Sequence, residues 1–160
     1  MKLGLLTAAL PGVPLPELAN WAAESGFGML EVACWPISRS DRRYGGVTHV
    51  DVDTLDKAGA SEVRAVMSDN GLEISALAYY PNILGSEGEQ RAFQIAHLKK
   101  VIDAAELLEV PIVGTFIGAD MTKYATENLE EYARVWPSIV KYAAERGIKI
   151  AIENCPMLWD

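Results

Sequence analysis

Short apolar runs alternate with longer amphipathic stretches along the chain, and this alternation predicts βα units that build a parallel sheet. Strands are expected at Leu3 to Ala8, Met29 to Trp35, Glu73 to Tyr80, Ile112 to Ile117 and Ile148 to Glu153. Helices are expected at Pro14 to Ser25, Ser61 to Asn70, Glu89 to Leu108 and Glu127 to Arg146. The pattern predicts an α/β fold in a single domain over residues 1–160.

Several expected helix ends share one motif, in which a glycine is followed by an apolar residue that packs back on the helix. Gly26, Gly71 and Gly147 occupy this position, and Glu109 takes the place of the glycine at a fourth helix end. In the last helix, Thr126 is expected to cap the first turn. Pro137 lies inside the same helix, where it is expected to kink or divide it.

Two architectures contain five strands and four helices in this order, the first part of an eight-stranded barrel and a complete doubly wound sheet. Length alone favours the doubly wound sheet. However, the turn Thr7 to Gly12 after the first strand has no glycine-rich nucleotide motif. Only seven residues follow Glu153, too few for a helix that covers the fifth strand. We therefore expect the chain to be an unfinished barrel.

Composition excludes several classes of partner. Half of the residues are apolar, and the formal net charge of −8 argues against nucleic acid. The basic cluster Arg39, Arg42 and Arg43 is interpreted as a solvated loop in preference to an anion site. No apolar run approaches the roughly 20 residues of a membrane span, and Cys34 and Cys155 form no CxxC pair. A location in the reducing cytoplasm, away from the membrane, is expected.

Candidate chemistry gathers where the strands end, because parallel α/β folds place their sites there. Glu153 ends the fifth strand, on the face opposite to Ile150 and Ile152. A carboxylate at this position must be paired, protonated or bound to a cation. Aromatic and polar residues follow the other strands and would suit a polyhydroxylated ligand. The substrate-binding candidates are Trp35, His49, Tyr79, Tyr80, Thr115 and Asn154.

Each candidate also has a purely structural explanation. Trp35, Tyr79 and Tyr80 can be core aromatics at the rim, and His49 can be a loop residue without a task. Glu31 lies deeper in its strand and is expected to be a buried partner of Lys149. His97 sits beside the apolar face of the third helix and is expected to be a satisfied packing residue.

Five segments, in this order, resemble the sugar isomerases and epimerases with a xylose isomerase-like TIM (β/α)8 barrel, a group that includes inosose dehydratase-like proteins. These segments are Gly26-Phe27-Gly28, Leu30-Glu31, His97 to Ala105, Gly114 to Gly118 after Val110-Pro111, and Ile148 to Met157 with its I-E-N-C-P-M. The likeness spans the whole chain. It implies that only about the first five strands and four helices of the barrel are present.

The resemblance also implies a function. The residue that corresponds to Glu153 binds a divalent metal (Mn2+, Mg2+, Co2+ or Zn2+) and takes part in proton transfer next to the carbonyl of a sugar or sugar phosphate. The further ligands, an aspartate, a histidine and a second glutamate, belong to strands six to eight. This chain alone is therefore expected to hold no metal and to be inactive.

Two alternatives remain open at this point. The chain can be a half-barrel that associates with itself, as a homo-oligomer, or with another chain, because its outer strands have unpaired edges. The less favoured alternative is an apurinic endonuclease on the same barrel. That class needs many histidines and a basic groove, whereas this acidic chain has two histidines.

Overall fold

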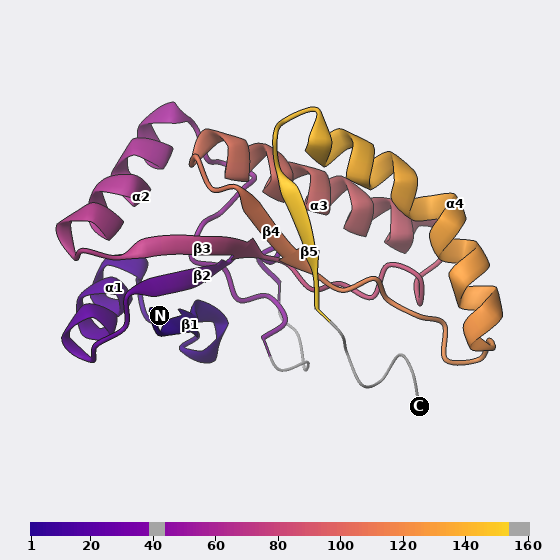
Figure 1. Cartoon of the computed structure of the whole chain (residues 1–160), viewed down its shortest axis with the longest axis horizontal. Coiled ribbons are helices and arrows are strands. Elements are labelled where there is room, and N and C mark those ends of the chain that lie inside the picture. The colour runs from indigo at the N-terminus through magenta and orange to yellow at the C-terminus, as the bar shows by residue number, and fades with distance from the viewer. Residues whose placement is uncertain (39–43, 154–160) are drawn as a thin grey trace.

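Five parallel strands form one sheet in the computed structural model, which describes residues 1–38 and 44–153 (Figure 1). The strands are β1 Gly4–Leu6, β2 Met29–Ala33, β3 Glu73–Ala78, β4 Ile112–Thr115 and β5 Lys149–Ile152. The connecting helices are η1 Thr7–Ala9, α1 Leu15–Glu24, α2 Lys57–Asp69, α3 Gly88–Leu107 and α4 Ala125–Ala144. The predicted alternation of strands and helices is confirmed.

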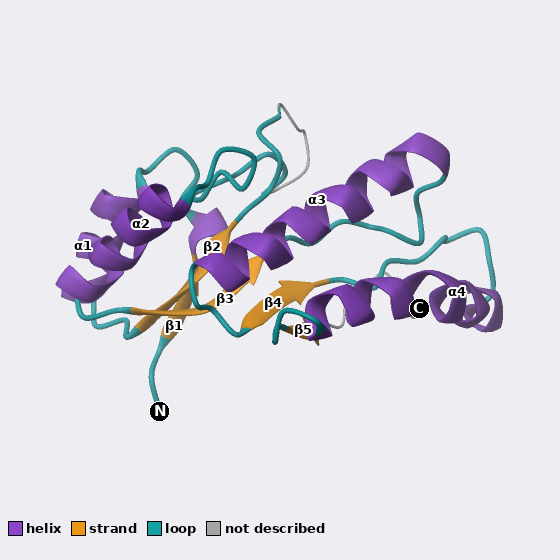
Figure 2. Ribbon diagram, turned by 90° about the horizontal axis from the view of Figure 1, so that it is seen from above, coloured by secondary structure: helices purple, strands orange, loops and turns teal. Residues whose placement is uncertain are grey.

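The strand order is β1-β2-β3-β4-β5, so each strand pairs with the next one along the chain. In a doubly wound sheet the order in which strands are added reverses at a switch point, whereas a (β/α)8 barrel adds each strand beside the previous one. The order therefore excludes the doubly wound alternative and matches the first five strands of a barrel. Figure 2 shows α1, α2 and α3 together on one side of this sheet.

Alternation along each strand separates the two faces of the sheet. Leu30, Val32, Leu77 and Val113 are fully buried and belong to the core under the helices. The opposite face carries Glu31 and Gly114, since a Cβ built on Gly114 would point at the Glu31 carboxylate. Glu153 shares this inner face with Ala151, two residues earlier. Glu153 also continues the β5 ladder, because its amide donates to the Thr115 carbonyl at 3.0 Å.

The core lies between the sheet and the helices. Leu18, Leu98, Ile102 and Trp136 are fully buried there, and complete burial of such a side chain stabilises the fold by roughly 1.5–3 kcal/mol. The Trp136 indole also donates to the Ile117 carbonyl at 3.3 Å, which satisfies its polar atom. Among the described helices, none combines the length and the hydrophobicity that a bilayer crossing requires.

The repeated helix end predicted from sequence is confirmed. Gly26, Gly71 and Gly147 have φ values of 86°, 64° and 70°, and Glu109 adopts the same left-handed conformation with φ 61°. At the end of α3 the Val110 amide donates to the Ala105 carbonyl at 2.8 Å, and the corresponding bond ends α4. Glu109 thus carries backbone strain that a glycine would avoid.

One expectation for α4 is wrong. Its N-cap is Tyr124, not Thr126, and the Tyr124 amide donates to the Glu127 carboxylate at 2.8 Å. Of the two effects expected from Pro137, a kink or a division, division does not occur, because the helix runs through the proline from Ala125 to Ala144. The hydroxyl of Ser138 donates to the Val135 carbonyl at 3.1 Å, so local bonding continues beside the proline.

Candidate active site

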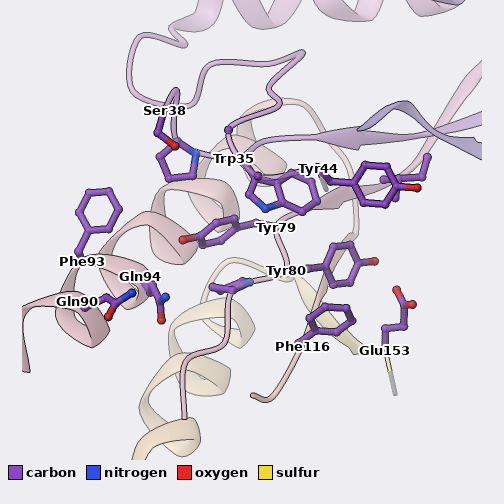
Figure 3. A pocket seen from close by; sticks show the side chains of 15 residues that line it. Trp35, Ser38, Tyr44, Tyr79, Tyr80, Gln90, Phe93, Gln94, Phe116 and Glu153 are labelled. Atoms are coloured by element: carbon purple, nitrogen blue, oxygen red, sulfur yellow. The ribbon is translucent and has the colours of Figure 1, made fainter. Parts of the chain in front are cut away.

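A pocket of about 490 Å³ opens at the carboxyl ends of the strands (Figure 3). Its described lining combines aromatic rings, two glutamines and one carboxylate. The lining residues are Leu6, Trp35, Pro36, Ser38, Tyr44, Gly45, Gly46, Tyr79, Tyr80, Pro81, Gln90, Phe93, Gln94, Phe116 and Glu153. Four of the predicted site residues, Trp35, Tyr79, Tyr80 and Glu153, therefore lie around one cavity.

Aromatic rings form a continuous wall of this pocket. The Trp35 ring lies 6.2 Å from the Tyr79 ring in an edge-on arrangement and 5.8 Å from the Tyr80 ring, measured between centroids. Phe116 continues the wall, 4.7 Å from Tyr80. Such pairs hold one another in place, and their exposed faces can stack on the apolar face of a ligand.

A hydrogen-bonded pair lies at the Glu153 end of the pocket. The Tyr80 hydroxyl donates to the Glu31 carboxylate. Burial raises the pKa of Glu31; the Tyr80 bond opposes this rise and the negative charge of Glu153 adds to it. Burial also raises the pKa of Tyr80, with further contributions from Glu31 and Glu153. Glu153 is exposed to solvent on the open inner face.

The expectation that Glu31 is the buried partner of Lys149 is wrong. Glu31 has Tyr80 as its partner, and no ion pair joins it to Lys149 within the described parts of the chain. Gly114 makes the Glu31–Tyr80 contact sterically feasible. A Cβ at this position would lie 2.5 Å from the Tyr80 hydroxyl oxygen and 2.8 Å from Glu31 Oε1.

The first turns of α3 supply the opposite side of the pocket, through Gln90, Phe93 and Gln94. These residues are missed from sequence alone, because the polar positions of an amphipathic helix are ordinarily solvated. A signal was available in the order of the elements. A helix that follows a strand end and its loop begins near the mouth, so the polar residues of its first turns can face the site.

The other predicted residues lie elsewhere. His49 lines a separate hollow with Leu15 and Pro16, and burial lowers its pKa although the backbone of Leu10 and Val13 bonds to it. Thr115 is fully buried, and its hydroxyl donates to the Phe116 carbonyl at 3.5 Å. Neither residue lines the pocket. Asn154, Cys155 and the basic cluster of Arg39, Arg42 and Arg43 fall outside the described residues.

His97 is a packing residue, as predicted. It is buried, its Nε2 is 2.8 Å from the Cys34 carbonyl oxygen, and its ring packs 4.7 Å from Tyr79. The thiol of Cys34 is free and buried, and burial raises its pKa well above the usual range. A thiol in that state is a poor nucleophile.

Two side chains hold the loops that frame the mouth. Asn82 joins the loop after β3 to the loop after β4, since its Oδ1 accepts from the Ala119 amide at 2.7 Å and its Nδ2 donates to the Ala119 carbonyl at 3.1 Å. Arg91 donates to the carbonyls of Ser86 at 2.6 Å and of Ile83 at 3.1 Å, and also bonds Glu131.

The described donor atoms do not make a complete divalent-metal site. No group of three or more His, Cys, Asp or Glu side chains comes together within residues 1–38 and 44–153. Magnesium and manganese favour six oxygen ligands, and Glu153 supplies at most two of them. The described residues therefore fit a metal only as part of a larger ligand set.

The comparison with protein families decides the affiliation of the chain. A family model described as xylose isomerase-like TIM barrel matches residues 19–159. The chain belongs to this family. The strand order and the site at the carboxyl ends of the strands agree with it, and the fold class predicted from the sequence is confirmed. No curated protein matches the sequence of this family member.

Solved structures show the same fold at low sequence identity. D-Psicose 3-epimerase from Clostridium cellulolyticum H10, solved with D-tagatose, has a TM-score of 0.72 at 18% identity and covers 100% of this chain. The probable 3-DHS dehydratase AsbF from Bacillus anthracis has a TM-score of 0.70 at 19% identity, over 98% of this chain. A xylose isomerase-like TIM barrel protein from Mycobacterium smegmatis, in complex with magnesium, has a TM-score of 0.63 at 15% identity, over 94%.

The chain spans only about half the length of these structures, namely 54%, 53% and 54% of their chains. Within that half, the described site offers an aromatic platform, a solvent-facing carboxylate and a buried carboxylate–phenol pair. This arrangement can bind a ring with hydroxyl groups and can exchange a proton at one end of it.

Proposed function

We propose that the chain provides the first half of a metal-dependent sugar or sugar-phosphate isomerase or epimerase. The observation that carries the proposal is the position of Glu153. It lines the aromatic pocket at the carboxyl ends of five parallel strands, which is where barrel enzymes keep their catalytic groups. Membership of the xylose isomerase-like family and the likeness to sugar epimerases support it.

In this proposal the sugar stacks on Trp35 and Tyr80, and its carbonyl end lies toward Glu153. The Glu153 carboxylate takes the proton from the carbon next to the carbonyl, and the second glutamate, which lies outside the described residues, returns a proton on the opposite face of the sugar. Tyr80, held by Glu31 and packed on Phe116, fixes the distance between the ring wall and that carboxylate. A positioned general base of this kind contributes about 10²–10⁴-fold to the rate.

Glu153 is also the proposed metal ligand of this half. Because the described residues form an incomplete ligand set, the remaining ligands must come from outside them. The same proposal places the protein in a reducing compartment such as the cytoplasm, since the described Cys34 is a free thiol.

Exchange of substrate hydrogen with solvent deuterium tests the proton transfer directly. The chain is incubated with MnCl2 and D-fructose in D2O, and deuterium at the carbon next to the carbonyl is followed by NMR. We expect no exchange by the chain alone. Exchange is expected when residues 1–153 are fused to the second half of the C. cellulolyticum epimerase.

The matched variants are Glu153→Gln and, as a control, Glu130→Gln, which changes an exposed carboxylate of α4. Glu153→Gln in the fusion should lower the exchange rate at least about 100-fold, and Glu130→Gln should leave it unchanged. Full exchange by the Glu153→Gln fusion would refute the proposed role, and rapid exchange by the chain alone would refute the need for further ligands.

The geometry also supports a second candidate, association of half-barrels. The outer strands β1 and β5 each pair on one side only within the described sheet. Ile152 at the β5 edge is 45% exposed. Unpaired edges of this kind favour association. Light scattering coupled to size exclusion should show dimers or larger species, and a stable monomer over a wide concentration range would count against this candidate.

A further inference from the structure

The pocket extends beyond the region that the proposed proton transfer uses. Glu153, Phe116 and Tyr80 lie at one end of it, whereas Phe93 and Gln94 on α3 lie at the other, with Trp35 and Tyr79 between them (Figure 3). The two ends come from elements that are separate in sequence, α3 on one side and β4 with β5 on the other. A ligand that fills the pocket therefore touches more than its reacting end.

A polar group at the α3 end has no partner among the described residues. Gln94 Oε1 is buried and accepts no hydrogen bond from any of them. The Tyr79 side chain is buried, and Figure 3 shows its hydroxyl directed toward the side of Phe93 and Gln94. Burial raises the pKa of Tyr79 to about 12, so this hydroxyl keeps its proton and can donate it to a ligand. A buried polar atom without a partner costs free energy, which a bound group can recover.

The surroundings of Gln94 define the chemistry of such a group. An amide offers two donors and an acceptor. Phe93 presents a ring that is 58% exposed, with the His97 ring stacked 6.3 Å away. The described lining contains no lysine or arginine. Neutral hydroxyl groups match the amide, and the apolar face of a sugar ring matches Phe93, whereas a phosphate would find no counter-charge in this lining.

The geometry points to a subsite formed by Gln94, Gln90, Phe93 and the Tyr79 hydroxyl, which binds an uncharged hydroxylated unit on the substrate end remote from the carbonyl. A second sugar ring is such a unit. The inference rests on the proposed function in one respect, the orientation of the carbonyl toward Glu153. It specifies the substrate class as an extended ketose or aldose that carries an uncharged hydroxylated unit at this end.

Direct binding to the 160-residue chain tests the subsite without catalysis. The probes are D-fructose, D-fructose 6-phosphate and isomaltulose, which is fructose carrying glucose on the oxygen remote from the carbonyl. Titrations are followed by the NMR signals of the Trp35 indole and the Gln94 side-chain amide. We expect isomaltulose to bind at least about tenfold more tightly than either of the other probes.

Two variants on α3 separate recognition from stability. Gln94→Leu should reduce isomaltulose affinity to that of D-fructose, and its melting temperature should be unchanged or higher, because it removes a buried unpaired oxygen. Glu89→Leu, an exposed position of α3 outside the pocket, should keep the preference.

Four results would overturn the subsite. The first two are equal binding of the three probes and a preference that survives in Gln94→Leu. The third is a Gln94→Leu variant that loses both affinity and thermal stability, since Gln94 would then be structural. The fourth is the absence of detectable binding by any probe. The deuterium exchange assay distinguishes these failures from failure of the proposed function. Exchange on D-fructose without any isomaltulose preference refutes the subsite alone, whereas a Gln94-dependent preference without exchange in the fusion refutes the isomerase proposal alone.

Discussion

Replacing Gly114 by alanine would place a methyl group between two side chains of the candidate site. The new carbon would lie 2.5 Å from the Tyr80 hydroxyl oxygen and 2.8 Å from Glu31 Oε1. Neither distance is compatible with van der Waals contact, so at least one of these side chains must move. Because Phe116 and Trp35 pack on the Tyr80 ring, we expect the hydrogen bond between Tyr80 and Glu31 to break.

The magnitude follows from that bond. A hydrogen bond to a charged group contributes about 1.5–3 kcal/mol, and a Gly→Ala change at an ordinary backbone conformation returns about 0.4–1 kcal/mol through the unfolded state. Gly114 has no positive φ that would oppose the substitution. Gly114→Ala should therefore lower the free energy of unfolding by about 1–2 kcal/mol.

Urea unfolding followed by the fluorescence of buried Trp136 measures this loss, and a double-mutant cycle identifies its cause. Tyr80→Phe alone should cost about 1.5–3 kcal/mol. In the Gly114→Ala background the same change should cost little, since the bond is already broken, which gives a coupling energy of about 1.5 kcal/mol. The matched control is Gly59→Ala in α2, where the new Cβ has room at 3.4 Å and the helix should gain about 0.5–1 kcal/mol. Additive losses in the cycle, or a Gly114→Ala chain as stable as the parent, would refute the reasoning.

Three further predictions concern the loops and helix ends. Glu109→Gly should raise the free energy of unfolding by about 0.5–1 kcal/mol, because φ 61° is strained for glutamate and accessible to glycine. Gly118→Ala should lower it by at least about 2 kcal/mol, since φ is 85° and a Cβ would lie 2.5 Å from Asn82 Oδ1. Hydrogen bonds from Thr122 lower the pKa of Asp120 to about 2 in the folded chain, below its ordinary 3.8. The stability that this carboxylate contributes is present above about pH 4 and is lost as the pH falls toward 2, and Asp120→Asn should lack this part of the acid dependence.

Matched variants distinguish each cause from a general effect. Glu109→Ala keeps a side chain in the left-handed conformation, so its stability should stay near that of the parent. Gly26→Ala has φ 86° with nothing within 4 Å of the new Cβ, so it should lose less than Gly118→Ala. Urea unfolding at about pH 5 and about pH 3 compares Asp120→Asn with the parent. Equal acid dependence of the two chains would contradict the assignment of the lowered pKa.

The sequence predicted the order of elements because buried parallel strands are continuous apolar runs and because the helix ends repeat one glycine motif. The prediction failed at the ends of helices and strands that local hydrogen bonds determine. Residues Thr7–Ala9, which were predicted to end the first strand, form a turn of 3-10 helix instead. The helix α2 begins at Lys57, because the Asp56 carboxylate accepts from the Gly59 amide at 2.8 Å. Neither boundary is marked by a change in the hydrophobic periodicity of the sequence.

The candidate site was predicted in part for a similar reason. Trp35, Tyr79, Tyr80 and Glu153 follow strands, so the fold class alone brings them to one edge of the sheet. The partner of Glu31 could not be inferred, because the pairing of β2 with β3 shifts between Leu30 and Glu31, and such a shift changes which side chains meet across the strands. The position of His49 outside the pocket depends on the path of its loop, and a loop has no hydrophobic periodicity from which that path can be predicted.

The Arg91 guanidinium has a consequence for ligand recognition that goes beyond stability. By gathering the carbonyls of Ile83, Leu84 and Ser86 while bonding Glu131, it fixes the segment between Pro81 and the first turn of α3 during folding. The conformational entropy of this segment is therefore lost during folding, before any ligand binds. A molecule that enters the pocket meets a loop whose backbone Arg91 already holds at three carbonyls, so a larger share of its contact energy can appear as affinity.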